Sequence, residues 1–218
     1  HGLVVHHPRY LLPPKVGMSV APLVLYAGAR RCVRALMAAG QTFDLIDAHY
    51  FYPDGVAAAL LARDLGKPFV VTGRGTDLNL IPRYAVPRRM MRWAAQRADG
   101  LVTVCDALRD DLAVLGVSRE RATVLRNGVD LDVFQRDRDA VVALRDGLDA
   151  PVLVSVGHLI PRKGHALVIR LIARLGRGTV LIVGTGPEDV RLRALAAELG
   201  VTDRVRFVGS VAHEDLRR

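Results

Sequence analysis

The sequence predicts an α/β protein made of two parallel-sheet units, and two features of the chain lead to that prediction. Short apolar runs alternate with longer amphipathic stretches over most of the 218 residues. This alternation is typical of βαβ units whose strands form a parallel sheet. It is interrupted once, at 129–149, where the chain is charged and poor in strand signals. Half of the residues are apolar, which is enough for a substantial core in each unit.

The first unit is expected to begin with a strand at Leu3-Val4-Val5 and a helix over 20–39 that ends before Gly40, a residue that suits a helix C-terminus. Asp54 follows the next strand and is expected to cap a helix N-terminus. The remaining strands are expected at 43–48, 69–72, 101–104 and 122–125, with helices between them at 54–65, 86–98 and 106–115.

The second unit repeats the alternation. Strands are expected at 151–156, 179–183 and 205–208, helices at 165–175 and 188–199, and a third helix from His213. We interpret the chain as two Rossmann-like domains, 1–130 and 150–218, joined by a linker at 131–149. In such sheets ligands bind outside the carboxyl ends of the strands, and we expect these ends to face a cleft between the domains.

The net charge of +9 comes almost entirely from arginine. Such a charge is compatible with nucleic acid, an anionic membrane surface or phosphorylated substrates. We interpret the excess of arginine as mainly the result of a host genome whose codon usage favours arginine and alanine. The arginines are dispersed, and no interleaved aromatic platform accompanies them, which disfavours a nucleic-acid-binding protein.

Several classes of site are disfavoured by the sequence. No apolar run approaches the roughly 18 residues that cross a bilayer. His6 and His7 have no third ligand at a useful spacing, so no metal site is predicted. Cys32 and Cys105 lie far apart, which favours a reducing, cytoplasmic setting. The chain starts at His1 and stops at Arg218 just after an expected helix start, so we expect a piece of a longer protein.

The loop at 157–164 carries the strongest functional signal. Arg162 and Lys163 stand next to Gly164, between an expected strand and an expected helix. A P-loop is rejected, because no serine or threonine follows the lysine. The two cations at a helix N-terminus suit an anion such as a diphosphate. The alternative, that both are solvated loop cations, stays open at this point.

Other loops at strand ends carry candidate residues. His49 is either a packed histidine or a cleft residue that touches substrate, and we favour the cleft. Arg74 and Asp77 stand beside glycines that allow a ligand to approach the backbone. The turn at 184–186 lacks the third glycine of a dinucleotide fingerprint, which disfavours an NAD-linked oxidoreductase. Phe207-Val208-Gly209 ends a strand where backbone groups could meet a nucleobase.

The expected helix at 86–98 carries basic residues beside methionine and tryptophan. Arg88 and Arg92 share one face, while Val86, Met90 and Ala94 form an apolar line. Such a helix can dock on an anionic bilayer surface. A core-packed helix with a solvated basic face is the alternative.

In their order and spacing, these motifs resemble the family-4 retaining glycosyltransferases of the GT-B fold. The stretch Arg74-Gly75-Thr76-Asp77 is similar to members that build bacterial surface polysaccharides, such as teichuronic-acid-type enzymes. The resemblance covers nearly the whole chain and is carried by 49–55, 73–77, 126–130, 157–164, 183–187, 208–209 and 213–216.

The resemblance implies a nucleotide sugar in the second domain and an acceptor in the first. Arg162 and Lys163 match the diphosphate-binding pair and would stabilise the departing diphosphate without a metal or another cofactor. His49 joins them as a catalytic candidate and lies, with Arg74 and Asp77, on the acceptor or sugar side. The donor-binding residues are then Gly157, Arg162, Lys163, Gly184, Gly186, Val208 and Gly209.

There are departures from the family pattern. Many members have His-Gly where this chain has Arg74-Gly75, so the role of that histidine cannot be transferred. Arg74 is expected to contact either the donor phosphate or the acceptor instead. The family's glutamate motif would lie beyond Arg218, and the glycine-rich acceptor loop near the start is missing. We therefore expect an incomplete second domain and no activity from this piece alone.

The predicted function is retaining transfer of a sugar from a nucleoside diphosphate sugar to a saccharide or lipid-linked acceptor, in bacterial polysaccharide or glycoconjugate synthesis. The enzyme is expected to be cytoplasmic, at the inner face of the cell membrane. The alternatives are a GT-B nucleotide-sugar epimerase or phosphorylase and, more remotely, a basic nucleic-acid-binding protein.

Overall fold

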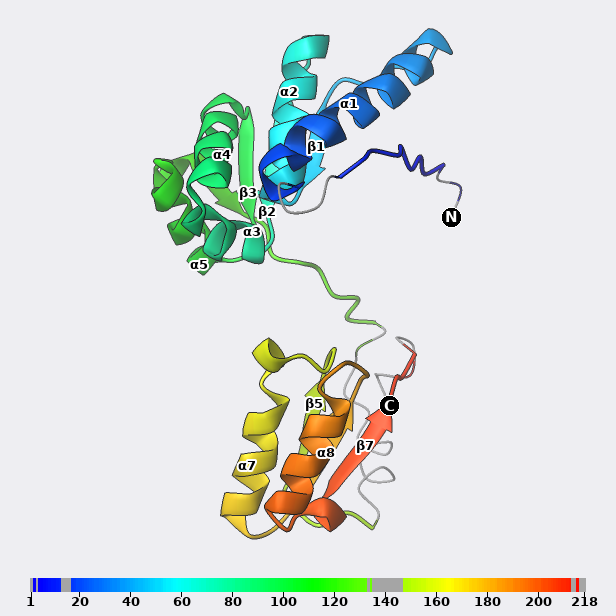
Figure 1. Cartoon of the computed structure of the whole chain (residues 1–218), viewed down its shortest axis with the longest axis vertical. Coiled ribbons are helices and arrows are strands. Elements are labelled where there is room, and N and C mark those ends of the chain that lie inside the picture. The colour runs from blue at the N-terminus through cyan, green and yellow to red at the C-terminus, as the bar shows by residue number, and fades with distance from the viewer. Residues whose placement is uncertain are drawn as a thin grey trace. The chain divides into compact units, whose positions relative to one another are not determined.

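The computed structural model describes residues 2, 4–12, 17–132, 134, 147–212 and 215. The chain divides into two compact units, His1–Gly128 and Val129–Arg218 (Figure 1). Each unit contains one parallel β-sheet with helices packed against it. The predicted α/β class with two parallel sheets is confirmed. The expected linker at 131–149 lies mostly outside the described residues, as does the helix expected from His213.

The sheet of the first unit has four parallel strands in the order β1-β2-β3-β4. They are β1 (Ile46–His49), β2 (Phe69–Gly73), β3 (Gly100–Thr103) and β4 (Ala122–Val124). The helices are α1 (Gly17–Ala38), α2 (Val56–Leu65), α3 (Thr76–Asn79), α4 (Ala85–Arg97) and α5 (Asp106–Asp111). Shorter helical turns lie at Phe51–Gly55, Ile81–Arg83, Leu112–Leu115 and Arg119–Arg121.

The core of this unit joins small helix residues to large strand residues. Alanines line the buried side of α2, so this helix packs closely on the sheet, where Phe69 and Val71 are almost fully buried. Met91 and Ala94 of α4 are also fully buried. Since each buried large side chain stabilises the fold by about 1.5 to 3 kcal/mol, this packing fixes the strand ends that carry the candidate residues.

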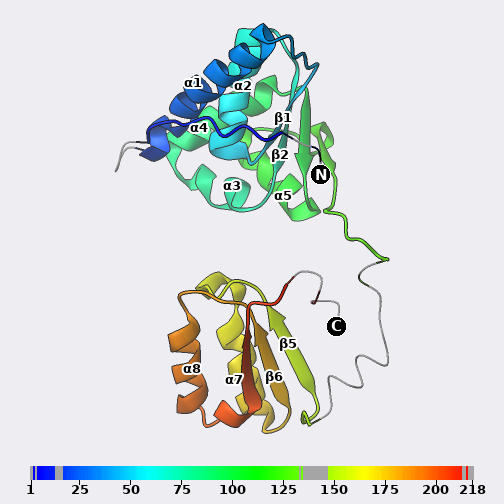
Figure 2. The ribbon, with the colours of Figure 1, turned by 90° about the vertical axis from the view of Figure 1, so that its right-hand side faces the viewer.

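The sheet of the second unit has three parallel strands in the order β5-β6-β7, which Figure 2 shows side by side. They are β5 (Val152–Val156), β6 (Thr179–Val183) and β7 (Val205–Gly209). Helices α7 (His165–Leu175) and α8 (Asp189–Glu198) share one core with the strands, in which Ile169, Ile172, Val180 and Ile182 are fully buried. Short turns lie at Pro161–Lys163 and Thr202–Arg204.

Two local predictions are wrong. Val4 and Val5 form no strand and are exposed. Among the described strands, β1 pairs only with β2, so this segment does not join the sheet. The segment runs along α1 instead, where Arg9 lies close to Gly28. Asp54 does not cap α2, because the cap position is Gly55 and no side chain bonds there.

The apolar line expected at Val86, Met90 and Ala94 of α4 lies partly at the surface. Val86 is about half exposed, and Met90 is only partly buried. The face that packs into the core is instead made by Pro87, Met91, Ala94 and Ala95.

Candidate functional site

The carboxyl ends of β1, β2 and β4 bring together a polar group in the first unit. His49 ends β1, Arg74 follows β2, and Asn127 lies just after β4. One guanidinium nitrogen of Arg74 lies 2.8 Å from His49 Nδ1, and the other donates to Asn127 Oδ1 at 3.1 Å. His49 Nε2 lies 3.1 Å from the Asp47 carboxylate. The structure therefore places two of the three predicted acceptor-side residues in direct contact.

The contacts of His49 fix which ring nitrogen carries the proton. A guanidinium only donates hydrogen bonds, so Nδ1 of His49 accepts from Arg74. The proton of the neutral ring then lies on Nε2, which donates to Asp47. All three side chains lie at the surface, so this group is accessible to a ligand.

Asp77, the third predicted acceptor-side residue, is fully buried. Its carboxylate accepts hydrogen bonds from the backbone N–H of Phe51 at 2.7 Å, of Arg74 at 3.0 Å and of Gly75 at 2.6 Å. Asp77 thus ties the loop after β1 to the loop after β2, and holds the backbone of Arg74 in place. A direct contact of Asp77 with an acceptor stays a prediction.

Tyr50 is a residue of this site that the sequence interpretation missed. Its φ of 88° makes it the one non-glycine residue with positive φ among the residues that the structure describes. Its hydroxyl lies 2.6 Å from Thr76 Oγ1, a second link between the two loops. A non-glycine residue in this region of φ costs of order 1 to 3 kcal/mol and is found where surrounding contacts enforce it. No sequence signal marks it.

Asp54 lies near the same loops. Burial raises the pKa of the Asp54 carboxyl above its ordinary value, and the negative charge of Asp77 acts in the same direction. Asp54 is thus a perturbed carboxyl beside the candidate site, where the sequence suggested only a helix cap.

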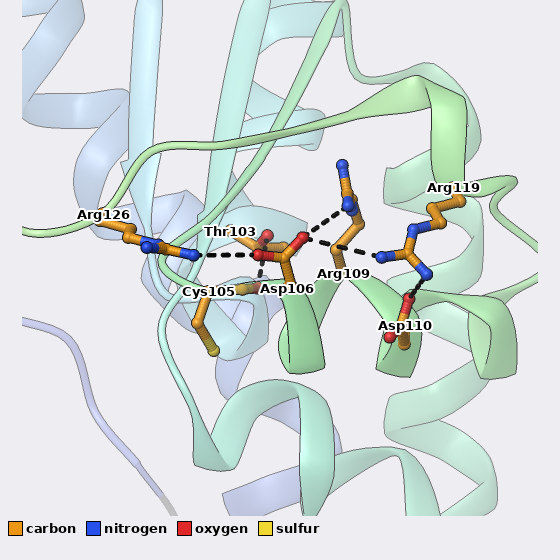
Figure 3. Close-up of polar contacts among 7 residues, drawn as sticks. All are labelled: Thr103, Cys105, Asp106, Arg109, Asp110, Arg119 and Arg126. Atoms are coloured by element: carbon orange, nitrogen blue, oxygen red, sulfur yellow. Dashed lines mark hydrogen bonds and ion pairs between the residues drawn. The ribbon is translucent and has the colours of Figure 1, made fainter.

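A second charged group lies at the carboxyl ends of β3 and β4 (Figure 3). The Asp106 carboxylate at the start of α5 contacts Arg109 at 2.5 Å and Arg126 at 3.3 Å. Arg119 reaches Asp106 at 3.7 Å and Asp110 at 2.8 Å. Each arginine of this cluster therefore has a carboxylate partner.

In the second unit, three loops at the carboxyl ends of the strands are joined by backbone hydrogen bonds. The N–H groups of Gly157 and Leu159 donate to the carbonyls of Val183 and Thr185, both at 2.9 Å. The N–H of Gly184 donates to the carbonyl of Gly209 at 2.7 Å. The predicted donor-binding glycines thus form one connected rim.

Two glycines of this rim, Gly184 and Gly186, are required by close backbone approach. A Cβ atom on Gly184 would lie 2.0 Å from the Gly157 carbonyl oxygen, and one on Gly186 would lie 2.6 Å from the Leu159 carbonyl oxygen. Gly184 also has a φ of 134°, which L-residues rarely adopt. Val208, beside this rim, is about half exposed.

Arg162 and Lys163 project from the turn that leads into α7. Both side chains are exposed, and no carboxylate of the described residues lies within ion-pair distance of either. Gly164 adopts a left-handed conformation with a φ of 75° and ends the turn directly before α7. This places two cations, unpaired as far as the described residues go, at the positive end of an 11-residue helix, an arrangement that attracts anions.

His165, the first residue of α7, fixes the position of the loop that carries Arg162 and Lys163. It is almost fully buried, and its Nδ1 lies 2.8 Å from Ser155 Oγ on β5. The contact ties the first residue of α7 to β5, so the loop between them is held at both ends.

Within the part of the chain that the structure describes, no cluster of three or more metal-ligating side chains occurs. None of the described helices combines the length and the apolar character of a membrane span. Cys32 and Cys105 are both free thiols.

Comparisons with known proteins match both units. The family model "Glycosyltransferase Family 4" matches residues 1–133, and "Glycosyl transferases group 1" matches residues 141–218. A 2-deoxystreptamine glucosyltransferase of Streptomyces kanamyceticus is 32% identical over 79% of this chain and 50% of the relative. A GDP-mannose-dependent alpha-(1-6)-phosphatidylinositol monomannoside mannosyltransferase of Mycolicibacterium smegmatis is 33% identical over 74% of this chain and 46% of the relative.

Solved structures give a consistent result for the fold. HepE of Anabaena in complex with UDP aligns with a TM-score of 0.69 and 22% identity, over 95% of this chain and 57% of that one. Sucrose-phosphate synthase of Thermosynechococcus elongatus aligns with a TM-score of 0.70 and 18% identity, over 96% and 56%. The chain spans about half the length of the curated relatives it matches.

Proposed function

The chain belongs to the family-4 glycosyltransferases of the GT-B fold, and from this premise we propose that the protein transfers a sugar from a nucleoside diphosphate sugar to a saccharide or lipid-linked acceptor with retention of configuration. The observation that carries the proposal is the donor corner of the second unit. There Arg162 and Lys163 stand unpaired among the described residues, beside three loops whose glycines bring their backbones together.

The donor corner suits a diphosphate leaving group. Arg162 can grip two phosphate oxygens with its planar guanidinium, and Lys163 adds a point charge. As the bond from the anomeric carbon to the diphosphate oxygen breaks, negative charge grows on the diphosphate. The two cations and the N-terminus of α7 stabilise that charge more strongly than the charge of the intact donor, which is how they accelerate transfer.

Retention is best accounted for by attack of the acceptor hydroxyl on the face that the diphosphate leaves. The new bond joins the acceptor oxygen to the anomeric carbon, and the hydroxyl proton passes to an oxygen of the departing diphosphate. This mechanism needs no carboxylate pair of the kind that a double displacement requires. On this proposal the cations of the donor corner supply the charge that a metal would otherwise provide.

The acceptor side is proposed to lie at the carboxyl edge of the first sheet, where Arg74 and His49 are in contact. In that position they would orient the acceptor hydroxyl rather than the nucleotide. The known relatives differ in donor, since one is named as GDP-mannose-dependent and the HepE structure contains UDP. Both nucleotides therefore belong in the test.

The test is a calorimetric titration of the full-length protein with UDP, GDP, ADP and their sugars. One nucleotide is expected to bind, and the double substitution Arg162→Ala, Lys163→Ala is expected to abolish that binding and nearly abolish transfer. Arg170→Ala, an exposed arginine on α7, is the matched control and should bind normally. Near-normal turnover of the double variant would reject the assignment, and conversion of a nucleotide sugar without any acceptor would favour the epimerase alternative.

A lipid-linked acceptor would require access to a membrane surface, and we propose that α4 provides it. Beside α4 lies a hollow of about 480 Å³. Arg88 and Arg92 are exposed on the same helix. Apolar side chains with a basic rim suit the interface of an anionic bilayer. The hollow is lined by Leu23, Val56, Leu60, Arg63, Val86, Arg89, Met90 and Trp93.

Co-sedimentation with vesicles that contain anionic lipid tests this second proposal. Binding is expected for the unchanged protein and should fall when Arg88, Arg89 and Arg92 are all replaced by glutamine. Equal sedimentation of the two proteins, or equal binding to neutral vesicles, would reject it.

A further inference from the structure

Within the described part of the chain, Arg74 is a positioned cation without a carboxylate partner. Its two hydrogen bonds go to neutral groups, the ring of His49 at 2.8 Å and the amide oxygen of Asn127 at 3.1 Å. Among the residues that the structure describes, no carboxylate lies within ion-pair distance of its guanidinium. Asp47 is reached only through the far side of the His49 ring. The positive charge of Arg74 is thus directed by its neighbours but not neutralised by direct contact.

The arginine cluster of Figure 3 shows the contrast within the same unit. Arg109, Arg119 and Arg126 all contact Asp106, and Arg119 also contacts Asp110. Those charges are largely compensated inside the protein. Two neighbouring residues after β4 take part in these two arrangements. Arg126 bonds to Asp106 in the compensated cluster. Asn127 accepts a hydrogen bond from Arg74, whose charge is not compensated by direct contact.

The surroundings of Arg74 keep its orientation fixed. Its backbone N–H is bonded to the buried carboxylate of Asp77, and its side chain is held on two sides by His49 and Asn127. The side chain is nevertheless exposed. The remaining N–H groups of the guanidinium are free to donate, and a planar guanidinium matches the paired oxygens of a phosphate or carboxylate. A pre-oriented donor loses little entropy when such a group binds.

We propose that the acceptor carries an anionic group, a phosphate monoester or a carboxylate, and that Arg74 binds this group. The inference rests on the proposed function and names the chemical class of the acceptor. The donor diphosphate is the other anion of the reaction, but Arg162 and Lys163 already provide two unpaired cations for it in the second unit. Arg74 belongs to the first unit, at the acceptor side of the proposal.

The test compares neutral and charged sugars of the same size. Glucose, glucose 6-phosphate and glucuronate are titrated into the full-length protein with saturating UDP, in a buffer free of phosphate. A charge-assisted pair of hydrogen bonds should make a charged sugar bind at least about tenfold more tightly than glucose. Arg74→Gln should remove that difference and leave UDP binding unchanged. Arg74→Lys, which keeps the charge without the planar geometry, should retain part of it.

Arg119→Gln is the matched control, because Arg119 is a half-exposed arginine of the same unit whose partners are carboxylates. It should keep the full preference for charged sugars. The inference is overturned if no charged sugar binds more tightly than glucose, including the case in which none of them binds. It is also overturned if Arg74→Gln weakens UDP instead, or if Arg119→Gln loses the preference equally. Where GDP or ADP binds instead of UDP, it replaces UDP in these titrations. Failure of all three nucleotides to bind the unchanged protein would instead reject the proposed function.

Discussion

Replacement of Asp77 by alanine offers a quantitative test of how the acceptor-side loops are held. The fully buried carboxylate accepts from three backbone N–H groups, those of Phe51, Arg74 and Gly75. Truncation leaves these donors without their partner, and each unsatisfied buried donor costs about 1 to 3 kcal/mol. The N–H groups of Arg74 and Gly75 are only partly buried and can recruit water, so we expect a total loss of about 3 to 5 kcal/mol.

Asp99→Ala is the matched control. The Asp99 carboxylate accepts from a single backbone N–H, that of Phe69 at 2.9 Å, so its loss should cost about 1 to 2 kcal/mol. The comparison thus separates a junction of three donors from a single hydrogen bond.

Urea unfolding followed by tryptophan fluorescence measures both variants. Trp93 is the single tryptophan of the chain and lies in α4, so the signal reports on the first unit. With a denaturant slope of about 2 kcal/mol per M, the midpoint should fall by about 1.5 M or more for Asp77→Ala, and by about 0.5 to 1 M for Asp99→Ala. Equal shifts for the two variants would refute the reasoning that Asp77 is the junction of the two loops.

Three further predictions concern other parts of the chain. Gly184→Ala should weaken nucleotide binding at least about tenfold, because its Cβ would lie 2.0 Å from the Gly157 carbonyl oxygen. Gly200→Ala is the control in the same titration. Gly200 has a φ of 63° and open space around it, so this variant should bind the nucleotide normally. Because burial raises the pKa of Asp54, the folded state takes up a proton more readily than the unfolded state, so this group lowers stability as the pH rises through its raised pKa. Asp54→Asn should therefore gain stability relative to the unchanged protein at neutral pH and lose that advantage in acid, as urea midpoints at several pH values will show; a constant difference would contradict this. Finally, treatment of the full-length enzyme with a chelator should leave the rate of sugar transfer unchanged. A loss of rate that a divalent cation restores would count against the metal-free mechanism.

Much of the fold could be predicted because local signals and tertiary packing agree. Helix α7 occupies 165–175 as expected, since Gly164 and Gly176 both adopt left-handed conformations at its ends. The buried strands β2 and β6 were equally clear, because each is a continuous apolar run between turn residues.

The parts that could not be predicted depend on contacts between distant residues. Asp77 looks like a ligand-binding carboxylate in its turn, and no local signal marks its bond to the backbone N–H of Phe51, 26 positions away. The apolar residues Val4 and Val5 have strand character, but a strand also needs a neighbouring strand, and local sequence does not specify one. The Arg74 contact with Asn127 spans 53 positions and leaves no local signal.

The backbone rim of the second unit has a consequence for engineering donor preference. Its hydrogen bonds join main-chain groups of Gly157, Leu159 and Gly184 to other main-chain groups, so these bonds do not depend on the exposed side chains of His158, Thr185 and Val208. A combinatorial library at His158, Thr185 and Val208 can therefore explore new base contacts on an unchanged frame. Gly184 and Gly186 must stay outside such a library, since a Cβ atom on either would clash with a backbone carbonyl of the neighbouring loop and displace it before selectivity could change.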